Sequence, residues 1–126
     1  MPEAGFAGLV LGYLVGSIPV GLWIGHWLSG EDLRGAGSGK IGATNAYRRF
    51  GLQWSLAIFL FDVAKGAIPV VLVRIAFDSP TAEVLAALAA LLGHIYPLYA
   101  GFRGGRAAAP GFGALLVLTP TAALAA

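Results

Sequence analysis

The first group of residues that could bind a ligand or take part in a reaction is a glycine-rich segment, residues 34–48, with basic and hydroxyl side chains. Its candidate residues are Arg34, Gly37, Ser38, Gly39, Lys40, Gly42, Thr44, Asn45 and Arg48. Glycines allow several backbone amides to converge on one anion, and the hydroxyl, amide and cationic side chains supply further donors. The segment could therefore bind phosphate, although it lacks the spacing of a Walker A loop. The alternative is a flexible loop beside a membrane, whose cations contact anionic lipid head groups.

A second segment repeats this combination over residues 101–106. Its candidate residues are Arg103, Gly104, Gly105 and Arg106. An arginine guanidinium can hold a phosphate through two parallel hydrogen bonds. Taken alone, the segment is better explained as a basic turn at the cytoplasmic side of a membrane. Two such segments on one side of the membrane would favour a shared anion site.

Three further ionisable residues lie in apolar surroundings. Asp62 and Lys65 are three positions apart, so they can face each other on one helix. Because charges inside a membrane are costly and usually paired, we interpret them as a structural pair. His94 precedes Pro97 by three residues, and we expect a packed or loop-bonding histidine rather than a catalytic base. The sequence has no cysteine and no cluster with metal-ligand spacing, so we expect no metal site.

The composition indicates whether water or lipid surrounds most of the chain. Of 126 residues, 58% are hydrophobic and 11% are charged, and the mean hydropathy is +0.81. A soluble domain carries about 25% charged residues, so most of this chain is suited to lipid. The net charge of +2 is too small to indicate nucleic acid as a partner.

Four apolar segments are candidates to cross a membrane, which needs about 20 residues for each helix. They cover residues 6–28, 52–77, 81–99 and 107–126. Their apolar runs are continuous rather than alternating, which favours helices over barrel strands. The sequence therefore predicts one all-α domain, a polytopic bundle of about four transmembrane segments. The fourth is weakened as a continuous helix by Pro110, Gly111, Gly113 and Pro120.

The basic residues predict the orientation of this bundle. Both glycine-rich segments carry arginine or lysine, whereas the N-terminal segment carries only Glu3 and the turn at residues 78–80 carries no basic residue. Since basic loops remain in the cytoplasm, we expect both glycine-rich loops to be cytoplasmic and the N-terminus to lie outside.

The motifs occur in an order that resembles a known family. They are Gly16-Ser17-Ile18-Pro19-Val20-Gly21, Asp32-x-Arg34-x-x-Gly37-Ser38-Gly39, Gly42-Ala43-Thr44-Asn45-x-x-Arg48, Asp62-x-x-Lys65-Gly66, Gly93-His94-x-x-Pro97 and Phe102-x-Gly104-Gly105. Over essentially the whole chain, this pattern resembles the bacterial membrane-bound acyl-phosphate:glycerol-3-phosphate acyltransferase family.

The resemblance implies an enzyme of phospholipid biosynthesis in the bacterial plasma membrane. It would transfer a fatty acyl group from acyl-phosphate to the sn-1 hydroxyl of glycerol-3-phosphate, forming lysophosphatidic acid without a cofactor or metal. Ser38, Thr44 and Arg48 would then lie in the active site. The second segment would bind glycerol-3-phosphate, with Arg106 in the place of the family's phosphate-binding lysine. Asp62, Lys65 and His94 would support the site.

The sequence also departs from the family pattern. Lys40 replaces an asparagine, Arg106-Ala107 replaces Lys-Gly, and Ala108-Ala109-Pro110 stands where Val-Ala-Thr is typical. Family members carry a third motif with histidine, asparagine and glutamate, and this sequence ends before it. We therefore expect a C-terminally truncated family member. The alternative is a degenerate relative that binds lipid phosphates or a partner subunit without catalysis.

Overall fold

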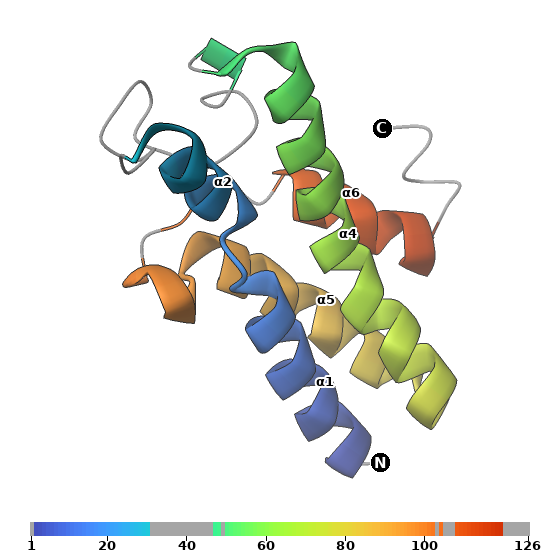
Figure 1. Cartoon of the computed structure of the whole chain (residues 1–126). Coiled ribbons are helices and arrows are strands. Elements are labelled where there is room, and N and C mark those ends of the chain that lie inside the picture. The colour runs from blue at the N-terminus through green and yellow to red at the C-terminus, as the bar shows by residue number, and fades with distance from the viewer. Residues whose placement is uncertain (1, 31–46, 49, 103, 105–107, 120–126) are drawn as a thin grey trace.

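A computed structural model shows an all-helical bundle (Figure 1) and describes residues 2–30, 47–48, 50–102, 104 and 108–119. Its elements are α1 (Pro2–Gly16), α2 (Val20–Ser29), α4 (Leu52–Phe77), α5 (Pro80–Ile95), the 3-10 turn η2 (Leu98–Ala100) and α6 (Ala108–Leu118). By length and composition, three segments can cross a membrane: Glu3–Ser29, Leu52–Phe77 and Pro80–Ala100. The helical membrane fold predicted from the sequence is confirmed. Helix α6 is shorter than a span, and residues 107 and 120–126 of the predicted fourth segment lie outside the described residues.

The first predicted span, residues 6–28, is divided into two helices. Helix α1 ends at Gly16 and α2 begins at Val20. Pro19 has no backbone N–H and disfavours helical geometry in the residue before it. The amide of Val20 donates to the carbonyl of Ile18 at 3.0 Å instead of continuing the helical pattern. The break lies within the apolar segment, where water cannot hydrogen-bond to the backbone groups that lack helical partners.

Helices α1 and α5 pack side by side through small residues spaced four apart. Gly8, Gly12 and Gly16 face Ala82, Ala86 and Ala90, and a Cβ atom on any of these glycines would overlap the α5 backbone. Lipid chains are as apolar as leucine, so membrane helices associate largely through such close backbone approach. This seam holds the first and third spans together.

The close packing of this seam predicts that two glycine-to-alanine variants differ strongly in thermal stability. Gly12→Ala places a methyl group against the carbonyl of Ala86, which should cost about 1–3 kcal/mol of stability through overpacking. Gly111→Ala is the matched control, because its Cβ would meet only a Leu91 methyl group, at 3.6 Å. Thermal unfolding in detergent should show a lower midpoint for Gly12→Ala alone. Equal midpoints would show that the seam is not tightly packed.

Helix α6 crosses α4 through a second close contact (Figure 1). Gly66 lies against the backbone of Pro110, and Gly113 lies against the backbone of Val63. Arg74 reinforces the packing: it forms a salt bridge to Glu83 of α5 at 2.7 Å and donates to the carbonyl of Val117 at 2.9 Å. These contacts tie α4, α5 and α6 into one unit.

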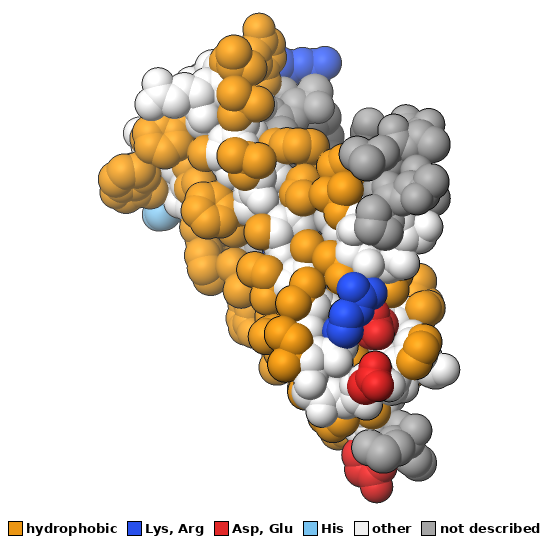
Figure 2. Space-filling view, turned by 90° about the vertical axis from the view of Figure 1, so that its right-hand side faces the viewer, with side chains coloured by type: hydrophobic (Ala, Val, Ile, Leu, Met, Phe, Trp, Pro, Cys, Tyr) orange, Lys and Arg blue, Asp and Glu red, His pale blue; other side chains and the backbone are white. Residues whose placement is uncertain are grey.

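The outside of the bundle is apolar, as a lipid-facing surface requires. Many large hydrophobic side chains are exposed, including Phe6, Leu60 and Ile75. Figure 2 shows hydrophobic side chains along most of one face, with charged side chains gathered at a few places.

Candidate active site

The structure describes five of the residues that the sequence identifies as candidates. Arg48, Asp62, Lys65, His94 and Gly104 can be placed. The others lie outside the described residues: Arg34, Gly37, Ser38, Gly39, Lys40, Gly42, Thr44, Asn45, Arg103, Gly105 and Arg106.

The two ends of the first glycine-rich segment are fixed by helix termini. Helix α2 ends at Ser29, and the left-handed backbone of the next residue, Gly30 (φ 72°), lets its amide donate to the carbonyl of His26 at 2.7 Å. Glycine adopts this conformation without strain, so the chain can leave the helix sharply at this point. At the other end, Tyr47 and Arg48 form a helical turn, and Gly51 (φ 92°) precedes α4.

Arg48 is exposed at this second end. It lies three residues before Gly51, whose amide donates to the carbonyl of Tyr47 at 3.0 Å. Its backbone is thus held next to the start of α4 while its guanidinium faces outward. This placement leaves an arginine available to a charged ligand at the end of the bundle.

Gly104, in the second glycine-rich segment, packs on the end of α5. The amide of Gly104 donates to the carbonyl of Ile95 at 3.0 Å, and a Cβ atom on Gly104 would overlap the carbonyl of His94. The structure therefore brings together two motifs that are separate in the sequence, one ending in Pro97 and the other containing Gly104. The His94 side chain is 1% exposed, so it lies in the packed interior beneath this segment.

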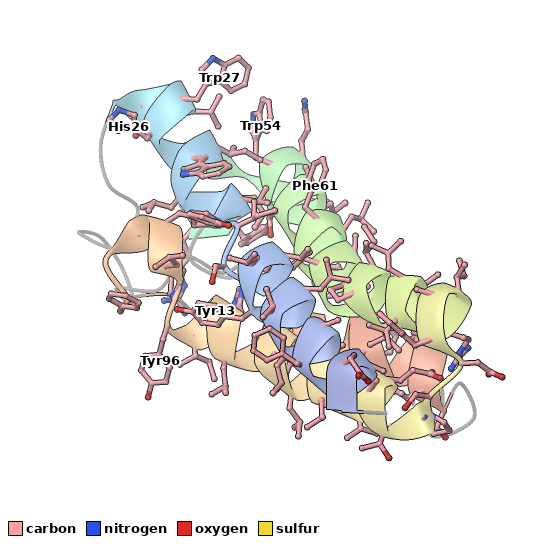
Figure 3. The ribbon with its side chains drawn as sticks, turned by 90° about the horizontal axis from the view of Figure 1, so that it is seen from below. Tyr13, His26, Trp27, Trp54, Phe61 and Tyr96 are labelled. Carbon is pink, nitrogen blue, oxygen red and sulfur yellow. The ribbon has the colours of Figure 1, made fainter. Side chains whose placement is uncertain are left out.

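The end of α5 is also held by α1. Gly93 approaches the backbone of Tyr13 and Gly16, and the Tyr13 hydroxyl donates to the carbonyl of Tyr96 at 2.8 Å. Figure 3 shows Tyr13 and Tyr96 at this meeting point. The second glycine-rich segment therefore starts from a rigid support.

Asp62 and Lys65 form the pair that their spacing predicts. The Lys65 ammonium lies 3.2 Å from an Asp62 carboxylate oxygen, and the two side chains are 5% and 3% exposed. The ammonium also donates to the carbonyl of Ile18 at 2.9 Å. This partner was missed from the sequence, although Pro19 inside an apolar run was a signal that nearby carbonyls lose their helical donors.

Among the described residues, no group of three histidine, cysteine or acidic side chains could hold a metal ion. Of the candidate residues that can be placed, Arg48 offers an exposed cationic side chain beside the start of α4. Such a side chain suits the binding of an anion.

The apolar spans, the broken first helix and the buried ion pair define a polytopic α-helical membrane protein. The chain belongs to the glycerol-3-phosphate acyltransferase family, whose model matches residues 6–126.

Relatives and solved structures agree with this assignment. The chain is 52% identical over 119 residues to a glycerol-3-phosphate acyltransferase of Myxococcus xanthus, and 50% identical over 125 residues to one of an Anaeromyxobacter strain. Each match covers 94% of this chain and 62% of the relative. The chain also resembles PlsY, an integral membrane glycerol 3-phosphate acyltransferase, in its glycerol 3-phosphate form (TM-score 0.86, 39% identity). That match covers 97% of this chain and 60% of PlsY. The chain thus spans about three fifths of the length of these proteins.

Proposed function

We propose that this chain is an acyltransferase that moves a fatty acyl group from acyl-phosphate to the sn-1 hydroxyl of glycerol-3-phosphate. The observation that carries the proposal is the likeness, at a TM-score of 0.86, to an acyltransferase in its glycerol 3-phosphate form. A PlsY structure in a lysophosphatidic acid form is also similar, with a TM-score of 0.82. The products would be lysophosphatidic acid and inorganic phosphate, with no cofactor or metal.

The proposed chemistry assigns separate tasks to the two glycine-rich segments. Ser38, Thr44 and Arg48 act at the reacting groups, and their neighbours from Arg34 to Asn45 donate hydrogen bonds to the phosphate of acyl-phosphate. Arg103, Gly104, Gly105 and Arg106 hold glycerol-3-phosphate. Both segments face the cytoplasm in the plasma membrane, with the N-terminus outside. The exposed position of Arg48 and the packed support under Gly104 favour this division.

The reaction needs no covalent enzyme intermediate. The substrate hydroxyl oxygen attacks the acyl carbonyl carbon, the bond from that carbon to the phosphate oxygen breaks, and the hydroxyl proton passes to the departing phosphate. Donors that stabilise the developing oxyanion and the phosphate charge would supply most of the rate enhancement.

A second candidate function is phosphate binding without turnover, by a degenerate family member or together with a partner subunit. The departures at Lys40, Arg106 and Pro110 favour it. Pro110 is buried and its backbone lies against Gly66, so this departure affects the α4–α6 contact as well as the second motif.

Purified chain in lipid cubic phase should separate the two functions. With acyl-phosphate and glycerol-3-phosphate supplied, we expect phosphate release to match lysophosphatidic acid formation and to require glycerol-3-phosphate. Folded chain that binds either substrate without forming product would support the second candidate. Folded chain that binds neither would contradict both.

A further inference from the structure

The break between α1 and α2 leaves backbone groups without their helical hydrogen-bond partners in the apolar part of the molecule. In a continuous helix, the carbonyl of Ile18 would accept from the amide four residues later. Here it accepts from Val20, only two residues later, and from the Lys65 ammonium at 2.9 Å. A hydrogen bond from a charged donor is stronger than one between neutral groups, and it has no competition from water in this setting.

The Lys65 ammonium is held in place by its own helix. Asp62 lies one turn earlier on α4, with its carboxylate 3.2 Å away, and both side chains are almost fully buried. A buried charge is tolerated when it is paired and its remaining donors are used. Asp62 therefore makes it possible for a cation to reach the break.

Helix α2 has few other attachments to the bundle. Ile24 packs against Ile58, and Trp27 meets Trp54 edge to face with ring centroids 5.8 Å apart (Figure 3). An open apolar pocket of about 410 Å³ lies between α2 and α4 beside the break. Residues from both sides line it: Val15, Ile18, Val20, Trp23, Ile24, Phe61, Ala64, Lys65 and Ile68. Side-chain packing is thus incomplete between α2 and α4 at the level where Lys65 bridges them.

We propose that Lys65, held by Asp62, is a positioning residue that fixes the break at Ile18 and thereby the placement of α2 relative to α4. The first glycine-rich segment belongs to the connection between α2 and α4. The described chain stops at Gly30, after α2, and resumes at Tyr47, just before α4. The distance between the two ends of this connection depends on the angle between α2 and α4. The bridge therefore sets the spacing of the phosphate-binding segment, a consequence that rests on the proposed function.

Two double variants test whether Lys65 positions α2 or only neutralises the charge of Asp62. Asp62→Leu with Lys65→Met removes both charges, and the replacement of a buried ion pair by apolar residues usually preserves folding. Asp62→Lys with Lys65→Asp keeps an ion pair but places a carboxylate opposite the Ile18 carbonyl. If the pair only neutralised charge within α4, the exchanged variant would behave like the original chain.

Spin labels can report the helix placement directly, because the chain has no cysteine of its own. Labels at His26→Cys on α2 and Leu60→Cys on α4 occupy exposed positions. The control labels, at Phe6→Cys and Leu88→Cys, report the glycine–alanine seam between α1 and α5. In lipid, we expect both double variants to shift or broaden the α2–α4 distance distribution and to leave the α1–α5 distribution unchanged.

Turnover provides the second readout. We expect both double variants to raise the KM for acyl-phosphate, the substrate assigned to the first segment, about tenfold, the loss that corresponds to one charge-assisted hydrogen bond. Unchanged α2–α4 distances, or equal broadening for both label pairs, would overturn the positioning role. If the original chain gives no turnover, the proposed function fails, while the distance measurement still decides the role of Lys65.

Discussion

Replacing Arg48 with alanine is expected to lower kcat/KM for acyl transfer by about 100- to 1,000-fold, the loss typical when a donor to a developing negative charge is removed. Arg48 is exposed beside the start of α4, and its guanidinium can hold a phosphate with two parallel hydrogen bonds. No other side chain type has this planar fork. Arg48→Lys should therefore keep the charge but recover only part of the rate.

The measurement pairs kinetics with binding. We expect calorimetric titration with glycerol-3-phosphate and with a non-hydrolysable acyl-phosphate analogue to show weaker binding of at least one ligand to Arg48→Ala. Tyr47→Ala is the matched control, because Tyr47 is the exposed neighbour and contributes its backbone carbonyl, not its side chain, to the bond with Gly51. Unchanged affinity for both ligands in Arg48→Ala would remove Arg48 from the phosphate site.

The sequence predicted the spans best where local signals mark both ends. Helix α4 covers Leu52–Phe77, the predicted range: Gly51 precedes it with a positive φ that favours glycine, and Asp78 ends it in a left-handed conformation. The third span, Pro80–Ala100, also agrees with its predicted range, but it is not one continuous helix. Helix α5 stops at Ile95, and Pro97 starts a separate 3-10 turn within the apolar run. Hydropathy describes the affinity of a segment for lipid, and it does not distinguish a helix from an apolar turn.

Contacts between distant segments were harder to predict. The pairing of Asp62 with Lys65 follows from helix geometry alone, but the bond to Ile18 depends on how α4 packs against the break. The four-residue spacing of Gly8, Gly12 and Gly16 was visible in the sequence, yet its partner on α5 becomes evident only when the two helices are placed. For the glycine-rich segments, the sequence predicted the donors, most of which lie outside the described residues, and the structure showed the supports at their ends.

The second variant with a large expected effect changes the glycine that packs the second glycine-rich segment against α5. Gly104→Val should raise the KM for glycerol-3-phosphate by about tenfold or more, because its Cβ would meet the backbone of His94, which cannot rotate away. The segment would have to move off α5, and the hydrogen bond from Gly104 to Ile95 would be lost. We expect the KM for acyl-phosphate to change less, since that donor is assigned to the first segment.

A control variant in the same segment distinguishes this steric effect from a general sensitivity to mutation. Gly101 has a left-handed backbone (φ 67°) and open space around it, so Gly101→Asn introduces a residue that tolerates this conformation without a clash. Kinetics in lipid should then show a normal KM for Gly101→Asn and a raised KM for Gly104→Val. Equal KM values in the two variants would mean that contact with α5 does not position the second segment. Its glycines would then serve backbone flexibility, and the ligand would have to be held by the two arginines alone.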